Sequence, residues 1–308
     1  TAERPRGGGV SVVVLRWFQT DNRLLWVLLA LLLATGWSTT GLVIRFIEEA
    51  SAPEITFYRG LCLSFAVTLF VASRYRINTA RAFRAIGWPG LMGAVGLGLA
   101  SVTFIAAIER TTIANISFLI AATPFFAGGL AWLIMREAMA PRTIAATGIA
   151  MIGIVVMVGE GFAVGSWLGN LLALACAFLS AFYVVGVRLG RGVDMVPTVA
   201  LSGLIAAGAA ATMIDSFYIS LHDFMLCALQ GIFISAVCNG LFTLCARHIP
   251  AGELTVLSML ESVLSPLWVF LILVEIPSTL TIIGGAIVLG AVSLQAFWPR
   301  RWRRNQAP

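Results

Sequence analysis

Apolar segments of 18 to 24 residues follow one another along most of the chain, separated by short polar connections. Of the 308 residues, 59% are hydrophobic and only 11% are charged. A soluble domain of this size could not bury so much apolar surface, whereas about 20 apolar residues in one helix cross a hydrocarbon core about 30 Å thick. The sequence therefore predicts an all-α integral membrane protein.

Hydropathy and turn-forming residues predict ten transmembrane helices. Residues 1–23 and 299–308 then form an N-terminal tail and a basic C-terminal tail, both cytoplasmic. The expected helices are 24–46, 54–73, 85–107, 112–135, 142–159, 166–187, 196–214, 222–245, 252–273 and 278–298.

Two parts of the chain resemble each other in sequence. Residues 108–137 align without a gap on residues 246–275, at an offset of 138. Residues 37–45 align more weakly on residues 180–188. The offset of 138 pairs Gly93 with Gly231, Phe104 with Phe242, Arg110 with His248, Ala114 with Gly252 and Glu137 with Glu275.

This duplication predicts the topology. The two repeats, 24–159 and 166–298, each contain five of the expected helices. Because five is an odd number, the second repeat must enter the membrane from the side opposite to the first. We therefore expect two inverted five-helix repeats around a central cavity, an arrangement that secondary transporters use for alternating access.

Arginine placement orients the expected helices, since short cytoplasmic loops retain positive charge. The chain has twenty basic residues, all of them arginine. Only Arg45 and Arg110 fall on the side opposite to the two tails, and Arg59 falls within a helix. The sequence predicts a multi-pass protein of the plasma membrane, of bacterial inner-membrane type, with both termini in the cytoplasm.

Other classes of function lack their sequence signals. The five cysteines have no metal-type spacing, His222 and His248 lie at expected helix ends, and no HExxH motif or phosphate-binding loop occurs. A channel is disfavoured because selective pores are usually built from rings or loops in oligomers. We expect no enzymatic activity, no cofactor, no metal and no nucleic-acid partner, and we keep an intramembrane enzyme as a distant alternative.

Several motifs recur in a fixed order along the chain. Trp37 and Arg45 fall in the first expected helix, Pro53 and Arg59 in the second, and segments rich in small residues open the fourth and ninth. A helix with spaced glycines follows each of those segments. In these features the chain resembles the EamA-type members of the drug/metabolite transporter (DMT) superfamily. The resemblance implies ten helices in two repeats and the export of amino acids and related metabolites, or the uptake of small solutes.

Glu261 and Arg59 are the strongest candidates for a binding site, because an ionisable group at bilayer depth costs about 2.5–3.5 kcal/mol on insertion scales. Glu261 lies about 13 Å from the cytoplasmic edge and Arg59 roughly 7–8 Å from the outer edge, which leaves about 9 Å of height between them. A small zwitterion could bridge the two, with its carboxylate on Arg59 and its ammonium on Glu261. Arg59 could instead extend to the surface or pair with Glu54, and Glu261 could be a protonated carboxyl between helices.

Other residues have weaker claims on the same cavity or on its movement. Ser and Thr side chains often bond back to their own helix, and Gly and Pro often serve packing or bending alone. The candidates for lining the cavity are Trp37, Ser38, Thr39, Tyr183, Asn239, Ser258 and Ser265. The candidates for gates or hinges are Gly93, Gly231, Pro124, Pro266, Asn115 and Glu253, with kinks expected halfway along the fourth and ninth helices.

The function that these features favour is a secondary transporter that exports amino acids, with a small-molecule substrate and membrane lipid as its partners. Few cationic groups lie within the helices, so highly anionic substrates such as sugar phosphates fit poorly. A broad exporter of cationic or amphipathic compounds, acting through Glu261, is the alternative. We expect a monomer or a weak homodimer.

Overall fold

The structure is a computed structural model that describes residues 23–108, 110–111, 116, 119–158, 167–214, 216–273 and 279–297. In these ranges all of the regular secondary structure is helical. Asn115 lies outside the described residues, as do the two tails.

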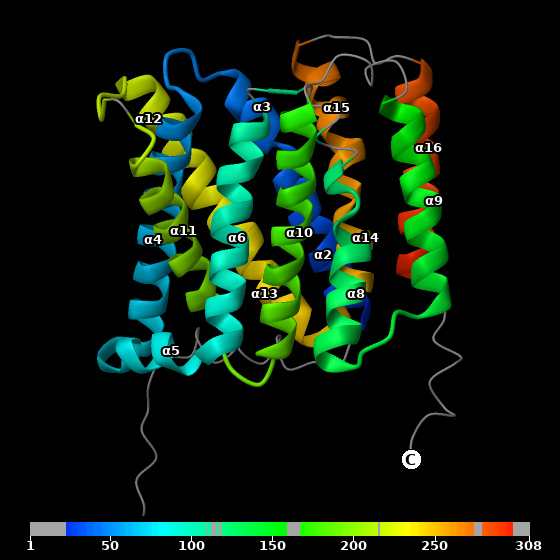
Figure 1. Ribbon diagram of the computed structural model, residues 1–308, viewed down its shortest axis with the longest axis horizontal. Coiled ribbons are helices and arrows are strands. Elements are labelled where there is room, and N and C mark those ends of the chain that lie inside the picture. Colours follow the sequence, from blue (N-terminus) through cyan, green and yellow to red (C-terminus); the bar gives the residue numbers. More distant parts are fainter. Residues whose placement is uncertain are drawn as a thin grey trace, which may run out of the picture.

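The helices begin and end close to the positions expected from hydropathy. The first part of the chain forms α2 (Arg23–Ser38), α3 (Thr40–Arg45), α4 (Ala52–Tyr75), η1 (Arg76–Asn78), α5 (Thr79–Ala85), α6 (Gly87–Ile108), α8 (Thr123–Met135) and α9 (Pro141–Val158). The second forms α10 (Trp167–Leu189), α11 (Val196–Ala211), α12 (Leu221–Ala228), η3 (Leu229–Ala236), α13 (Val237–His248), α14 (Ala251–Ser258), α15 (Leu260–Leu273) and α16 (Thr279–Phe297). Most of them run side by side in one bundle (Figure 1).

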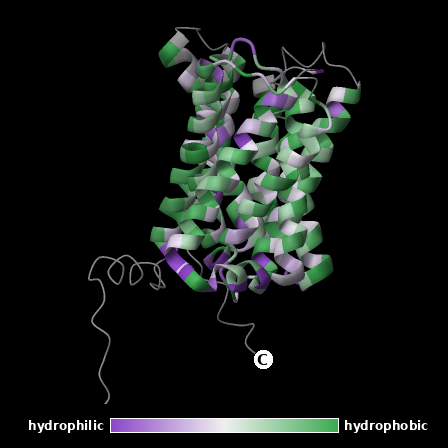
Figure 2. Cartoon of the chain, turned by 90° about the vertical axis from the view of Figure 1, so that its left-hand side faces the viewer, coloured by the Kyte–Doolittle hydropathy of each residue, from purple (hydrophilic) through white to green (hydrophobic). Residues whose placement is uncertain are grey.

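Among the described residues, five helical segments are long and apolar enough to cross a membrane. They are Arg23–Ile44, Ala52–Ala85, Gly87–Ile108, Trp167–Leu189 and Leu221–Cys245. Shorter apolar helices, such as Val196–Ala211, lie among them. Figure 2 shows hydrophobic residues along the sides of the bundle and hydrophilic ones gathered toward its two ends. Outward-facing side chains such as Leu28, Leu32 and Phe65 are more than half exposed, as lipid-facing residues should be.

Glycines allow the closest helix contacts. A Cβ atom added at Gly60 in α4 would lie 2.7 Å from the carbonyl oxygen of Gly203 in α11, and one added at Gly203 would lie 2.5 Å from the carbonyl oxygen of Gly60. In the same way, a Cβ atom at Gly153 in α9 would lie 2.7 Å from the carbonyl oxygen of Gly284 in α16. Small residues at such crossings are the usual means of packing helices in a membrane.

Two of the expected helices are broken, and the breaks occupy matching positions. The fourth is interrupted by a turn at Ala121 and Ala122, directly before α8, and Pro124 lies in the first turn of α8. The ninth is interrupted at Met259, between α14 and α15. Pro266 lies within α15, after this break, and the kink expected at Pro266 stays a prediction. Met259 is the counterpart of Ala121 at the offset of 138.

The eighth helix is irregular, whereas the third is not. The segment η3 has π-helical geometry and contains Gly231, while α6 runs without interruption through Gly93. A Cβ atom at Gly231 would lie 2.6 Å from the carbonyl oxygen of Arg59 in α4, and one at Gly93 would lie 3.2 Å from the Cγ2 atom of Thr198. Both glycines therefore serve close packing, and π-helical segments often occur beside functional sites.

We expect Gly231→Ala to destabilise the protein, because the added methyl group would meet the α4 backbone and force the two helices apart. Overpacking of this kind typically costs about 1–3 kcal/mol. Gly240→Ala is the matched control, since a Cβ atom at Gly240 meets nothing within 4 Å. Thermal unfolding in detergent measures the difference. Equal midpoints for the two variants would contradict the packing described here.

A buried carboxylate joins two connections at the upper end of the bundle in Figure 1, where α12 begins. The side chain of Asp223 accepts hydrogen bonds from the backbone amides of Glu48 (3.2 Å), Glu49 (2.9 Å) and Ala50 (2.9 Å). His222 lies 3.0 Å from the same carboxylate. The connection between α3 and α4 is thereby fastened to the start of α12.

Candidate functional site

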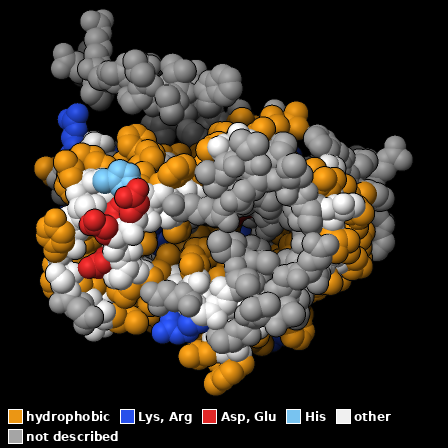
Figure 3. Space-filling model, turned by 90° about the horizontal axis from the view of Figure 1, so that it is seen from above, with side chains coloured by type: hydrophobic (Ala, Val, Ile, Leu, Met, Phe, Trp, Pro, Cys, Tyr) orange, Lys and Arg blue, Asp and Glu red, His pale blue; other side chains and the backbone are white. Residues whose placement is uncertain are grey.

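A cavity of about 360 Å³ lies among α2, α3, α4, α6, α8, α10, α11, η3, α13, α14 and α15. Ile44 and Ile108, near the upper ends of α3 and α6, line it, and so do residues from the middle of the bundle. Seen from above, the upper face is hollowed near its centre, and acidic side chains gather to one side of it (Figure 3). Its volume suits a small metabolite.

Two residues of opposite charge line this cavity. Arg59 comes from α4, and its guanidinium donates a hydrogen bond to the hydroxyl of Ser101 in α6. Glu261 lies in the first turn of α15, directly after the break at Met259. A carboxylate is stabilised at the amino end of a helix by the helix dipole.

A group of polar side chains from the irregular eighth helix lines the cavity as well. Gln230 donates to the Thr40 hydroxyl at 3.4 Å and accepts from the Ser235 hydroxyl at 3.2 Å. The Asn239 amide nitrogen donates to the Ser235 backbone oxygen at 2.8 Å. Tyr183, from α10, donates its hydroxyl proton to the Asn239 backbone oxygen at 3.1 Å. These bonds fix the side chains on one wall.

Three aromatic rings form a continuous wall of the cavity. The ring centroids of Trp37 and Phe242 are 5.6 Å apart, and those of Phe242 and Tyr183 are 5.2 Å apart with an angle of 28° between the ring planes. All three residues line the cavity, although Phe242 and Tyr183 are almost fully buried. Such a wall can pack against an apolar side chain or lie over an ammonium group.

The structure brings most of the expected cavity residues together. The ones that line the cavity are Trp37, Arg59, Tyr183, Asn239, Ser258, Glu261 and Ser265. Pro124, which was expected to act as a gate or hinge, lines it as well. Gly93, Gly231 and Glu253 are not part of the lining, and nothing is described for the side chain of Pro266.

Ser38 and Thr39 do not line the cavity, which corrects their assignment to it. Ser38 is almost fully buried; its hydroxyl donates to the Thr35 carbonyl at 2.6 Å and accepts from the indole nitrogen of Trp268 at 2.7 Å. Thr39 lies at the turn between α2 and α3 and donates to the Gly36 carbonyl at 2.7 Å. Both hydroxyls therefore serve the helix and its neighbour, as serine and threonine in membrane helices often do.

Among the cavity-lining residues are several polar or aromatic ones that sequence reasoning did not single out as candidates for the site. Four of them are Ser101, Thr123, Gln230 and Phe242. The internal duplication carried a signal for three of them, because the offset of 138 pairs Ser101 with Asn239, Thr123 with Glu261 and Phe242 with Phe104.

The lower end of the bundle in Figure 1, where α5 lies, is closed by ion pairs. Glu253, at the start of α14, is almost fully buried and pairs with Arg23 of α2 and with Arg142 of α9, the latter at 3.6 Å. The guanidinium of Arg188 lies 3.2 Å from the carboxylate of Glu137 and donates to the backbone oxygens of residues 246 and 247. These contacts hold together the ends of helices from both halves of the chain.

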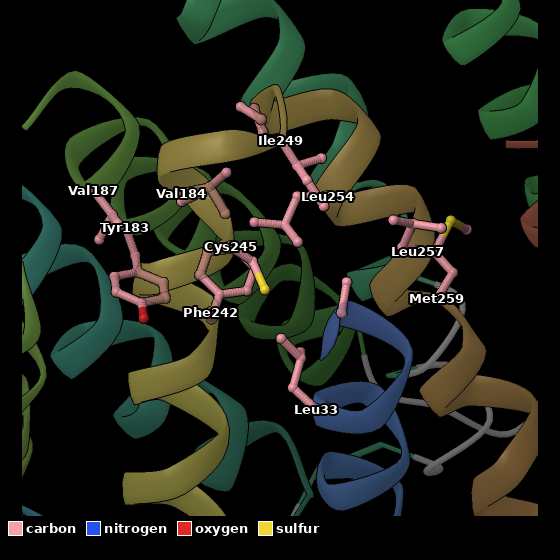
Figure 4. Packing of buried hydrophobic residues seen from close by; sticks show 14 of the residues in the cluster. Leu33, Tyr183, Val184, Val187, Phe242, Cys245, Ile249, Leu254, Leu257 and Met259 are labelled. Carbon is pink, nitrogen blue, oxygen red and sulfur yellow. The ribbon is translucent and has the colours of Figure 1, made fainter. Parts of the chain in front are cut away.

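A layer of packed hydrophobic side chains separates these ion pairs from the cavity. Figure 4 shows Leu33, Cys245, Leu254 and Leu257 converging from α2, α13 and α14, with Phe242 and Tyr183 beside them. Leu33, Cys245, Leu254 and Leu257 are completely buried. The cavity therefore lies on the upper side of this layer.

The comparisons with known proteins agree with this architecture. The model of the EamA-like transporter family matches residues 24–159, and that family belongs to the DMT superfamily, so the resemblance seen in the sequence is confirmed. No curated protein matches the chain in sequence. One crystal structure, titled only "Crystal structure of protein", covers 91% of this chain and 100% of its own, with a TM-score of 0.75 and 20% identity. The chain is thus a multi-pass membrane protein with the fold of that structure and a match to a family of transporters.

Proposed function

We propose that this protein is a secondary transporter of small zwitterionic metabolites, most of all amino acids, which it exports by alternating access. The observation that carries this proposal is the presence of Arg59 and Glu261 in one cavity. An amino acid carries one negative and one positive group, so a site with one charge of each sign complements it. The aromatic wall would then receive an apolar side chain.

The packing of the helices supports two inverted repeats, 24–159 and 166–298, with ten spans in all. The contact of α6 with α10 has its counterpart in that of α13 with α2, and the contact of α8 with α10 in that of α15 with α2. The contacts of α4 with α11, of α9 with α16 and of α8 with α14 each join a helix to its own counterpart in the other repeat. A two-fold relation leaves such contacts unchanged. This is the pattern that a two-fold relation between the halves produces.

The charges of the cavity break that two-fold relation. Thr123 of the first half stands where Glu261 stands in the second, and Ser101 stands where Asn239 does. Near Arg59 the two halves align at a different offset, 144, which pairs Pro53 with Pro197. At this offset the counterpart of Arg59 is Gly203. The first half therefore supplies the cation and the second half the carboxylate, which favours one orientation of a zwitterion.

The lower end of the bundle is the cytoplasmic end in this proposal, because the arginine-rich connections gather there. The cavity, which lies above the hydrophobic layer, then belongs to a conformation that is closed toward the cytoplasm. Export requires the opposite closure, with the ion pairs of Glu253 and Arg188 broken. The protein would work in a bacterial inner membrane, as a monomer or weak homodimer with lipid around it, and without a cofactor.

A broad exporter of cationic or amphipathic compounds is the second candidate. Glu261 beside the wall formed by Trp37, Phe242 and Tyr183 favours it, since aromatic faces and a carboxylate together attract organic cations. Arg59 opposes it, because the arginine would remain without an anionic partner from the substrate.

Transport into proteoliposomes separates the two candidates. Radiolabelled leucine, threonine, methionine and phenylalanine are compared with a quaternary ammonium dye under the same gradients. We expect saturable transport of at least one amino acid and little transport of the dye. Transport of the dye alone would replace the first candidate with the second, and transport of neither would remove both.

We expect Glu261→Gln to reduce amino-acid transport by about 10-fold or more, because an interaction with a charged partner contributes about 1.5–3 kcal/mol. The glutamine keeps the size of the side chain and removes its charge. Ser265→Ala, a change at another residue of the cavity wall without a charge, is the control and should have a small effect. Normal amino-acid transport by Glu261→Gln at every pH would remove Glu261 from the binding site.

A further inference from the structure

The amide of Asn239 presents a buried hydrogen-bond acceptor without a donor. Its Oδ1 atom has no hydrogen-bond partner among the residues that the structure describes, and the residue is 7% exposed. Asn239 nevertheless belongs to the lining of the cavity. A buried acceptor left unpaired is rare and costly in folded proteins, so it calls for a partner that the protein itself does not supply.

The orientation of this amide is fixed by its other end. The Nδ2 atom donates to the Ser235 carbonyl at 2.8 Å, and a flipped amide would bring two oxygen atoms against each other. The backbone oxygen of the same residue is occupied by the Tyr183 hydroxyl. Oδ1 is therefore the acceptor of Asn239 that remains unpaired, and because the atom has almost no exposed surface in this conformation, a donor from a ligand reaches it when the cavity wall rearranges around the substrate.

The surroundings of Asn239 indicate what that donor is. Glu261 lines the same cavity as Asn239 and brings a carboxyl group to it. A primary ammonium group carries three N–H donors and a positive charge, so it can bond to the amide oxygen while it is paired with the carboxylate. A quaternary ammonium group has the charge but no donor.

We propose that Asn239 selects substrates with an N–H-bearing ammonium group, by accepting a hydrogen bond from it at Oδ1. This inference rests on the proposed function and deepens it, since it assigns the ammonium end of a zwitterion to the pair of Asn239 and Glu261. This hydrogen bond also discriminates amino acids from their fully methylated analogues. The charge of Glu261 alone does not discriminate between them, because both kinds of ligand carry a positive charge. A site built to bond a donor rejects a ligand that lacks it, because the buried acceptor then stays unpaired.

Binding measurements with two ligands test the proposal. The ligands are phenylalanine and its N,N,N-trimethyl derivative, which keeps the ring, the carboxylate and the positive charge but has no N–H group. Their dissociation constants are measured on the purified full chain in nanodiscs. We expect the wild-type protein to bind phenylalanine about 10- to 100-fold more tightly.

Two variants locate the origin of this preference. In Asn239→Leu, which is close to asparagine in shape but has no acceptor, phenylalanine should bind more weakly and the ratio between the ligands should fall to near one. In Asn239→Asp, which retains an acceptor oxygen, the preference for phenylalanine should persist. Size-exclusion profiles and thermal midpoints identify a variant that fails to fold, and the wild-type ratio and the Asp variant still decide the question in that case.

The possible failures can be told apart. Equal binding of the two ligands by the wild-type protein, or an unchanged ratio in Asn239→Leu, would overturn the role of Asn239 and leave the zwitterion site in place. A wild-type protein that binds neither ligand would overturn the zwitterion site, and the role of Asn239 with it.

Discussion

Arg59→Gln should abolish the recognition of a substrate carboxylate while it spares the recognition of the amine. Arg59 lines the cavity and is held there by its hydrogen bond to Ser101. A guanidinium binds a carboxylate through charge-assisted hydrogen bonds, each worth about 1.5–3 kcal/mol. We therefore expect kcat/KM for phenylalanine to fall about 10- to 100-fold. Phenethylamine, which has the same ring and amine but no carboxylate, should be transported at least as well as by the wild-type protein.

The comparison of the two substrates makes this prediction specific. A variant that is merely damaged should lose transport of both substrates to the same extent. Arg81→Gln is the matched control, because Arg81 is an exposed arginine on α5, away from the cavity lining. If Arg59→Gln loses transport of phenylalanine and of phenethylamine to the same extent, Arg59 does not bind the substrate carboxylate.

Glu253→Gln should open the lower end of the bundle. The carboxylate is 2% exposed and pairs with Arg23 and Arg142, so its loss leaves two arginines close together without their shared partner. Removing one member of a buried ion pair costs about 3–5 kcal/mol, which is enough to shift a two-state equilibrium about 100-fold or more. The cost applies only to the conformation in which these groups meet, so the opposite conformation gains population.

Two native cysteines report this shift. Cys245 is completely buried in the hydrophobic layer, and Cys176 lines the cavity. In chains that retain only one of these cysteines, we expect Glu253→Gln to speed the labelling of Cys245 by an impermeant maleimide added on the lower side. Labelling of Cys176 from the upper side should slow at the same time.

The paired readout distinguishes alternating access from local loosening. Local loosening at the lower end would expose Cys245 and leave Cys176 unaffected. Asp194→Asn serves as the control, because Asp194 lies at the same end but bonds to Tyr75 (2.8 Å), outside the group around Glu253. If both cysteines label as in the wild-type protein, Glu253 has no part in the closure.

The bounds of the helices and the two charged residues followed from the sequence because the membrane imposes simple physics on both. A span needs about 20 apolar residues, so hydropathy locates it within a few positions. An arginine or glutamate in an apolar segment is costly, so Arg59 and Glu261 were visible without any structure. Asn239 was found by the same argument in a weaker form.

The rotation of each helix about its axis was the part that the sequence did not determine. Ser38 and Trp37 are neighbours in the chain, yet the indole of Trp37 faces the cavity and the hydroxyl of Ser38 faces Trp268. The segment η3 has π-helical geometry, which a period of 3.6 residues does not predict, and Gln230 in this segment lines the cavity. The break at Met259 has no proline at its position, so the search for helix-breaking residues did not locate it.

Counterflow in proteoliposomes tests the central claim most directly, namely that this cavity alternates between the two sides of the membrane with a zwitterion bound. Vesicles loaded with unlabelled phenylalanine are diluted into a trace of labelled phenylalanine. A carrier should accumulate the label transiently above its equilibrium level, and Arg59→Gln should lose the overshoot. Equilibration of the label without an overshoot, or an overshoot that Arg59→Gln and Glu261→Gln both retain, would contradict the account.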